Sequence, residues 1–386
     1  IAIKALSRSK REKMRLNPVD WLLYIVLRTI KAFDRRDTDL KHFDPDRVKN
    51  ILVVSSTAIG DTLLSTPAIK AVRERYPDAK IIAHFNKSNM EMFENNPHID
   101  GIIPYYGGYK KFLKTIREFR KHRFDVILIL HGNEPQATPM AYLSGADFIV
   151  KRPNTSEYNF LLSNREPVVK LEDMGHGIEQ RLKVAALIGC NAKDKRMVLP
   201  VEKRDEDAVA TFMAKEGVKN DDILVGFQVG ASTVSRIWFA DRFVELGKRL
   251  MAIYPKVRII ITGSPDERDY CERIAEGIGE GVVVSAGRLP LRQAPALVKR
   301  FNVLVTGDTG IMHTAIAVGT SIVALYAVAD WKRTGPYYDL ERHRVIQKWK
   351  TCDPCVSKKC EYQKCMENIS VDEVFDAVTE IVGGVM

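Results

Sequence analysis

The sequence predicts an α/β protein with two doubly wound domains, each a parallel sheet covered by helices on both faces. Short apolar runs rich in Val and Ile alternate with helical patterns along most of the chain, and this alternation is typical of such sheets. It breaks once, at the polar stretch 190–205, and then restarts. With 386 residues, 45% hydrophobic and 28% charged, the chain is long enough for two globular domains.

These patterns divide the chain into four parts, with 190–205 as the linker between the domains. We expect a basic N-terminal extension at 1–48, a first domain at 49–195, a second domain at 196–350, and a cysteine-rich segment with a final helix at 351–386. Ligands of doubly wound sheets bind beyond the carboxyl ends of the strands. Two such domains facing each other would therefore bind ligands in the cleft between them.

The expected elements alternate in both domains. In the first, we expect strands at 50–55, 80–85, 99–104 and 124–131, and helices at 62–76, 109–122 and 175–189. In the second, we expect strands at 223–229, 257–262, 303–306 and 320–326, and helices at 241–253, 265–277 and 311–318. The loop 56–61 follows the first strand of the first domain, and the last strand is expected to close the second sheet.

The turn 307–310 (GDTG) joins a predicted strand to a predicted helix. A helix N-terminus offers unpaired N–H groups and a partial positive charge, and the glycines would let a phosphate approach the main chain. An anionic ligand is therefore plausible at Asp308 and Thr309. The alternative is that one of these two side chains only caps the helix. His313 lies one helical turn further on and favours the ligand interpretation.

The N-terminal extension is basic and contains an apolar run. The first 50 residues hold 13 Lys and Arg against 7 Asp and Glu, and so carry most of the net charge of +10. The apolar run 19–30 is shorter than the roughly 20 residues that span a bilayer, and Arg28 interrupts it. Trp21 and Tyr24 beside a cationic flank are typical of a helix in the interface of an anionic membrane. The alternative is a helix that packs on the protein's own body; no cleavage pattern of a signal peptide follows the run.

Three motifs carry a resemblance to a known family. Residues 55–69 (SSTAIGDTLLSTPAI), 307–313 (GDTGIMH) and 333–336 (RTGP) resemble motifs of glycosyltransferase family 9, the ADP-heptose:lipopolysaccharide heptosyltransferases. The order and spacing hold from about residue 50 to the C-terminus.

This resemblance implies a GT-B fold of two Rossmann-like domains. The second domain would bind the nucleotide-sugar and the first the acceptor. It also implies inverting transfer of heptose from ADP-heptose to an inner-core lipopolysaccharide or related glycan. The protein would work in the cytoplasm, peripherally on the inner face of the cytoplasmic membrane, which its N-terminal helix would contact. No nucleic acid partner is expected.

The resemblance also assigns roles to particular residues. Asp61 matches the proposed catalytic base, and the alternative for this residue is a helix N-cap. The expected donor-binding residues are Arg236, Glu267, Asp308, Thr309, Gly310 and His313. Gly60 and His131 are expected on the acceptor side. Where the family usually reads Lys-Arg-Trp-Pro, residues 236–239 read Arg-Ile-Trp-Phe; a guanidinium can hold a diphosphate through two parallel hydrogen bonds.

Single-displacement transfer needs a carboxylate to take the acceptor's proton and positive groups on the departing diphosphate. Asp61 would supply the carboxylate, and the amides at the start of the helix after residue 310, together with Arg236, would supply the positive groups. No cofactor is then required for catalysis.

Four cysteines are clustered near the C-terminus. Cys352, Cys355, Cys360 and Cys365 fall within 14 residues, a spacing that lets one loop bring four thiolates to a tetrahedral zinc or iron ion. Two disulfides are the alternative, which an oxidising compartment would favour. A closed site of four thiolates has no open coordination position, so a metal bound there would be structural.

Two other functions remain open from the sequence. The same fold could use another nucleotide-sugar donor or a protein acceptor, or it could bind a nucleotide-sugar without turnover. A protein that only binds would have no use for a base in the opposite domain, so Asp61 together with the 307–313 motif favours an enzyme.

Overall fold

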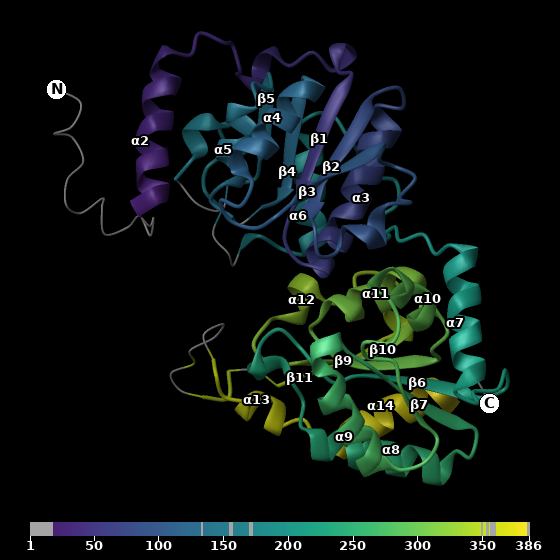
Figure 1. Ribbon diagram of the computed structural model, residues 1–386. Helices are drawn as coiled ribbons and strands as arrows, with labels where there is room; N and C mark the ends of the chain where they lie inside the picture. Colours follow the sequence, from purple (N-terminus) through teal and green to yellow (C-terminus); the bar gives the residue numbers. More distant parts are fainter. Residues whose placement is uncertain are drawn as a thin grey trace.

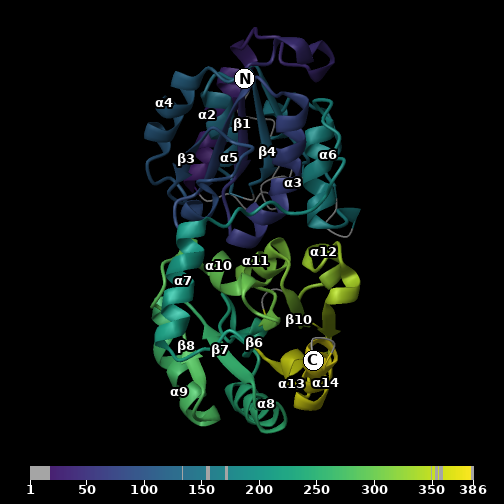
Figure 2. The same ribbon diagram turned by 90° about the vertical axis from the view of Figure 1, so that its right-hand side faces the viewer.

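The computed structural model describes residues 18–132, 134–153, 157–169, 173–348, 350–352, 355 and 360–383. They form two α/β units, one above the other in Figure 1, and the chain crosses from the first unit to the second just before α7 (Lys203–Lys215). The crossing segment and α7 lie on the right-hand side of Figure 1, and in Figure 2, seen from that side, the segment runs across the molecule from α6 to α7. Helix α7 thus begins within the predicted linker.

The first unit contains a sheet of five parallel strands in the order β3-β2-β1-β4-β5. The strands are β1 (Asn50–Ser55), β2 (Lys80–Asn86), β3 (Gly101–Tyr105), β4 (Val126–His131) and β5 (Phe148–Lys151). The helices are α2 (Pro18–Phe33), α3 (Ile59–Arg75), α4 (Phe112–His122), α5 (Ala137–Leu143) and α6 (Gly177–Ala186). This strand order is that of a doubly wound sheet.

Alternate residues of each central strand face different helices. Ile51 and Val53 of β1 belong to the apolar cluster that contains α3 and α6, whereas Leu52 and Val54 belong to the cluster that contains α2, α4 and α5. All four are at most 2% exposed. Burial on both faces explains why these strands are apolar throughout, without alternation.

The second unit contains six parallel strands in the order β11-β10-β9-β6-β7-β8. The strands are β6 (Ile223–Gln228), β7 (Val257–Thr262), β8 (Val282–Val284), β9 (Val303–Gly307), β10 (Ser321–Tyr326) and β11 (Arg344–Gln347). Besides α7, the helices are α8 (Ala240–Ile253), α9 (Arg268–Ile278), α10 (Ala294–Lys299), α11 (Gly310–Val318), α12 (Trp331–Thr334), α13 (Lys364–Glu367) and α14 (Val371–Gly383). Helices α7, α10 and α11 contribute to the cluster on one face of the sheet, and α8, α9 and α14 to the cluster on the other.

Short 3-10 helices punctuate both units. They are η2 (Leu40–His42), η3 (Pro45–Arg47), η4 (Met90–Phe93), η5 (Asn159–Leu161), η7 (Val234–Arg236), η8 (Pro265–Glu267), η9 (Leu291–Gln293) and η10 (Leu340–Arg342).

One apolar cluster continues from the first unit into the second. It includes Leu63 and Leu64 of α3 and Ile178 of α6, and also Met312 and Ala315 of α11. The two units therefore share a buried interface, which fixes the helix starts on either side of the cleft.

The structure differs from the expected elements at several places. Helix α3 begins at Ile59, so Gly60 and Asp61 lie in its first turn and the expected loop 56–61 is shorter. The N-cap position is Ala58, which makes no side-chain cap, so the N-cap interpretation of Asp61 is wrong. The sheet of the second unit does not close with β10, because the half-buried strand β11 pairs beyond it.

Helix α2 buries one face and exposes the other. Tyr24 and Leu27 are buried, and Tyr24 packs on the rings of Tyr158 and Phe160. The apolar residues left exposed on α2 are Val19, Trp21, Leu22, Val26, Ile30 and Phe33. The helix thus packs on the body of the protein and still presents an apolar face. The basic residues between positions 4 and 15 lie outside the described residues. Within the described part of the chain, no helix is long and apolar enough to cross a membrane.

Candidate active site

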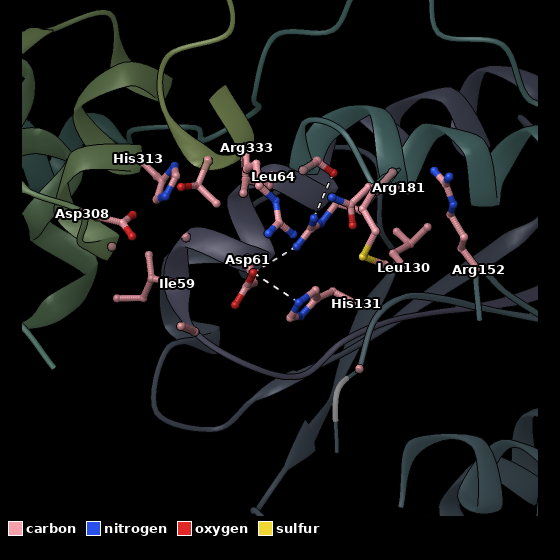
Figure 3. Close-up of a pocket in the computed structure, with 18 of the residues that line it drawn as sticks. Ile59, Asp61, Leu64, Leu130, His131, Arg152, Arg181, Asp308, His313 and Arg333 are labelled. Atoms are coloured by element: carbon pink, nitrogen blue, oxygen red, sulfur yellow. Dashed lines mark hydrogen bonds and ion pairs between the residues drawn. The ribbon is translucent and has the colours of Figure 1, made fainter. Parts of the chain in front are cut away.

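A cavity of about 710 Å³ lies between the two units, at the carboxyl ends of their central strands. Its lining residues come from both units (Figure 3). From the first unit they include Gly60, Asp61, His131, Lys151, Arg152 and Arg181, and from the second Arg236, Asp308, Thr309, Gly310, His313 and Arg333. In each sheet the strand order reverses at this edge, between β1 and β4 and between β6 and β9, where doubly wound sheets bind ligands.

The carboxylate of Asp61 is held by three side chains. Oδ1 lies 3.0 Å from Arg181 Nη2 and 3.4 Å from His131 Nε2. The Thr57 hydroxyl donates to Oδ2 at 2.8 Å and also lies 2.8 Å from His131 Nδ1. Because the single hydroxyl proton is directed to Asp61, His131 Nδ1–H donates to the Thr57 oxygen. The network fixes the rotamer of Asp61 and leaves its side chain 31% exposed toward the cavity.

These contacts also set the charge of Asp61. Burial alone would raise the pKa of this carboxyl, but His131, Arg181 and the Thr57 hydrogen bond outweigh burial and hold it below its ordinary value. Asp61 is therefore ionised at neutral pH, as a proton acceptor must be.

The first turns of α3 and α11 touch each other across the cleft. A Cβ at Gly60 would lie 2.4 Å from Cδ2 of His313. A Cβ at Gly310 would lie 3.0 Å from the Cβ of Ile59. Both glycines are needed for this close approach. Gly60, expected on the acceptor side, thus contacts the residue expected on the donor side.

Thr309 and Asp308 make different contacts at the start of α11. Thr309 is the N-cap, accepting a hydrogen bond from the Met312 amide. Capping is therefore correct for Thr309. The carboxylate of Asp308 lies 3.5 Å from Arg236 Nη1, which also donates to the Asp308 carbonyl at 3.3 Å. Arg236 thus sits directly beside the helix N-terminus.

His313 is buried on α11, and burial lowers its pKa. Its Nδ1 and Nε of Arg236 are buried and find no hydrogen-bond partner within the described part of the chain. Most buried polar groups in proteins have a hydrogen-bond partner from the protein or from ordered water, so these two nitrogens can accept such a partner from water or a ligand. They lie on the side of the cavity that is expected to bind the donor.

Glu267 lies apart from the lining of this cavity. Its Oε2 accepts a hydrogen bond from the Ser264 amide in a capping box, and its carboxylate lies over Gly230, where a Cβ would be 1.8 Å from Oε1. The residue follows β7, and β6 lies between this strand and β9, which precedes the Asp308 turn. The structure thus places Glu267 at the same sheet edge without bringing it to Asp61.

Four cavity cations were not expected from the sequence as site residues. Arg181, Lys151 and Arg152 belong to the first unit and Arg333 to the second. Burial lowers the pKa of Lys151 to about 8. Nη1 of Arg152 and Nε of Arg333 are buried without a partner among the described atoms. The RTGP motif contains Arg333, whereas no motif marked the other three.

The cysteine segment does not form the expected metal site in this structure. Across the described positions, no three His, Cys, Asp or Glu side chains come close enough to hold a metal ion. Cys365 is buried beside the Thr351 hydroxyl, and Cys360 contacts the Tyr362 carbonyl. None of the four is in a disulfide. Parts of the segment, 353–354 and 356–359, lie outside the described residues.

Two Rossmann-type units with a carboxylate on one wall of the cleft and a helix N-terminus with a guanidinium on the other define a GT-B glycosyltransferase. Residues 112–366, more than half of the chain, match the sequence profile of glycosyltransferase family 9 (heptosyltransferase). The chain belongs to this family, and it is a glycosyltransferase.

Several heptosyltransferases are similar to this chain in sequence, and solved structures share its fold. The lipopolysaccharide core heptosyltransferase OpsX of Haemophilus influenzae is 22% identical over 76% of this chain and 83% of its own. Lipopolysaccharide heptosyltransferase 3 of Escherichia coli is 23% identical over 75% and 86%.

A family 9 glycosyltransferase from Veillonella parvula shares the fold with a TM-score of 0.72 at 21% identity, covering 87% of this chain and 97% of its own. The E. coli ADP-heptose lipopolysaccharide heptosyltransferase II has a TM-score of 0.71 at 20% identity, with coverage of 87% and 99%. E. coli heptosyltransferase WaaC, solved with ADP-2-deoxy-2-fluoro heptose, has a TM-score of 0.60 at 16% identity, with coverage of 86% and 99%.

The Gly60–His313 contact gives a first prediction. Gly60→Ala should destabilise the protein by about 1–3 kcal/mol, the usual cost of overpacking a filled interior. Thermal and denaturant unfolding measure the loss, and Gly383→Ala is the control because a Cβ there meets nothing within 4 Å. In a His313→Ala background the same substitution should cost little. Equal destabilisation in both backgrounds would contradict the contact.

Proposed function

We propose that this protein transfers heptose from ADP-heptose to a sugar of the lipopolysaccharide core or a related glycan. The observation that carries the proposal is the arrangement of one cavity. An ionised, clamped Asp61 lies on the wall formed by the first unit, and the start of α11 with Arg236 lies on the other. The relatives named as lipopolysaccharide heptosyltransferases support the choice of sugar and acceptor.

The donor side is the second unit. The amides at the start of α11 and the guanidinium of Arg236 attract a diphosphate and stabilise the charge that develops on it as it leaves. Asp308 holds Arg236 in place, and beside them His313 presents a buried nitrogen that has no hydrogen-bond partner among the residues that the structure describes. Glu267, at the neighbouring loop, is suited to hydrogen bonds with a ribose.

The acceptor side is the first unit. Asp61 removes the proton of the acceptor hydroxyl while that oxygen attacks the anomeric carbon, and the diphosphate leaves from the opposite face. His131 and Gly60 shape this wall. Lys151, Arg152 and Arg333 suit an acidic sugar, because their charges line the cavity and two of them have buried nitrogens without partners among the described atoms.

A different nucleotide-sugar donor, a protein acceptor, or binding without turnover remains the alternative. Titrating the protein calorimetrically with ADP-heptose, UDP-glucose and GDP-mannose separates the donors. The proposal expects binding of ADP-heptose and of ADP, and much weaker binding of the other two. Incubation with ADP-heptose and a core acceptor lacking heptose then tests turnover, and binding without transfer to any glycan would favour a sensor.

A second prediction concerns the base. Asp61→Asn should lower kcat by about 10²-fold or more, as removal of a general base does. The amide keeps the size of the side chain and cannot accept the proton. Affinity for ADP, measured by calorimetry, should stay within a few-fold because no donor contact is lost. Turnover close to that of the unaltered enzyme would remove Asp61 from the mechanism.

We also propose that α2 binds the inner face of the cytoplasmic membrane as a peripheral contact. Its exposed apolar face is continuous along the helix, and Phe33 at its end is 81% exposed. The extension also holds six Lys and Arg between residues 4 and 15. Each basic residue near an anionic surface contributes about 1 kcal/mol.

The third prediction concerns a triple variant in which Leu22, Val26 and Ile30 are all replaced by Ser. These side chains face outward, so the fold should be kept while co-sedimentation with phosphatidylglycerol vesicles is lost. Transfer to a soluble acceptor should not change, and uncharged phosphatidylcholine vesicles are the control. Undiminished sedimentation of the triple variant would assign α2 to packing alone.

We further propose that Cys352, Cys355, Cys360 and Cys365 bind one structural zinc or iron ion. The support is their spacing in the sequence, which places four possible thiolate ligands within one short segment. Binding would require the segment to draw the four thiols together.

The fourth prediction is one metal ion per chain by elemental analysis, and a lower melting temperature for Cys352→Ser with ADP affinity retained in the folded protein. A closed site contributes to folding and does not reach the cavity. A metal-free protein whose four thiols all react freely without change in melting temperature would exclude the site.

A further inference from the structure

Arg181 is buried directly behind the carboxylate of Asp61. Its side chain is only 3% exposed, although it lines the cavity through its tip. Three partners hold the guanidinium: Nη2 lies 3.0 Å from Asp61 Oδ1, Nε donates to the Ser65 hydroxyl at 3.1 Å, and Nη1 donates to the Gly177 carbonyl at 2.8 Å. A planar guanidinium bonded on three sides cannot turn to follow a ligand. Its visible task is to hold Asp61.

The same helix that carries Arg181 is docked on the second unit. His176, the N-cap of α6, lies 3.1 Å through Nε2 from the Gly335 carbonyl, and its ring stacks on Tyr337 with centroids 4.5 Å apart. The Tyr337 hydroxyl donates to Glu179 of α6. These contacts join α6 to the loop that follows α12. Helix α12 carries the cavity residue Arg333.

Gly177 connects the two sets of contacts. Its carbonyl accepts from Arg181, and there is no room for a side chain at this position: a Cβ would lie 2.9 Å from Leu64 Cδ1 and 3.4 Å from the Arg333 carbonyl. A displacement of the loop after α12 would therefore move the start of α6, and with it the group that fixes Asp61.

We propose that Arg181 is a positioning residue for Asp61. We further propose that α6 couples the orientation of the Asp61 carboxylate to the contact that residues 333–338 of the second unit make with α6. The inference rests on the proposed role of Asp61 as the base. Arg181 keeps the carboxylate ionised and pointed at the cavity, and it does so fully only while the loop from the second unit is seated on α6.

Arg181→Gln tests the first part, with Arg181→Lys as the conservative variant and Arg117→Gln, on the exposed side of α4, as the control. Arg181→Gln should lower kcat by about 10²-fold, the loss expected from misplacing a reacting group. The KM for donor should change little, and Arg181→Lys should recover part of kcat.

The pH profile separates positioning from a merely structural role. Arg181 lowers the pKa of Asp61, and transfer needs Asp61 ionised, so activity falls as pH falls through that pKa. Without Arg181 the pKa rises, and the acid limb of kcat should move to higher pH. A uniform loss of kcat with an unmoved acid limb, or a loss matched by unfolding in circular dichroism, would overturn the proposal.

Tyr337→Phe tests the link through α6, with the exposed Tyr362→Phe as its control. It removes only the hydroxyl bonded to Glu179, so kcat should fall several-fold, with the acid limb displaced in the same direction. In the Arg181→Gln background, Tyr337→Phe should have no further effect on kcat. If the effects of the two substitutions on kcat were fully additive, the proposed coupling through α6 would be wrong.

If the unaltered enzyme does not transfer heptose, the proposed function fails. If it does so through Asp61 and the Arg181 variants keep the acid limb in place, only this inference fails.

Discussion

The contact between the first turns of α3 and α11 is the constraint on which the site depends. Two helix starts meet across the cleft with a glycine on each side, so that His313 packs on Gly60 and Ile59 on Gly310. The apolar cluster that runs through both helices keeps them in that position. Because Asp61 follows Gly60 and Asp308 precedes Gly310 by two residues, this contact also sets how the proposed base and the proposed diphosphate site face each other.

The two walls of the cleft use opposite electrostatics for one displacement reaction. On one wall, a guanidinium, an imidazole and a hydroxyl surround a carboxylate and keep it ionised. On the other, the N-terminus of α11 and Arg236 form the proposed diphosphate site, and the carboxylate of Asp308 is paired with Arg236. A base that is held ionised and a leaving group that is drawn away suit a direct attack by the acceptor.

The sequence was sufficient for the two-sheet fold because buried parallel strands are apolar on both faces, and Ile51 to Val54 show this directly. Short motifs at strand ends also pointed to Asp61, Thr309 and His313, and all three line the cavity in the structure; their roles in binding and catalysis stay predictions. The sequence could not predict Arg181, which is 120 residues from Asp61 and has no local motif. Ala58 gave no capping signal, so the start of α3 was placed too late, and β11 was missed because an edge strand that is half-buried lacks an apolar pattern. The cysteine spacing predicted a closed metal site, and no such group of ligands is found among the residues that the structure describes.

The central claim is that one carboxylate on the acceptor wall drives a single displacement at the anomeric carbon. The anomeric configuration of the transferred sugar tests it most directly, read by proton NMR on the first product formed from ADP-heptose and a heptose-free core acceptor. The account predicts a glycosidic bond with the configuration opposite to that of the donor. A product that retains the donor's configuration would contradict it, because a single displacement from the face opposite the leaving diphosphate inverts the anomeric carbon.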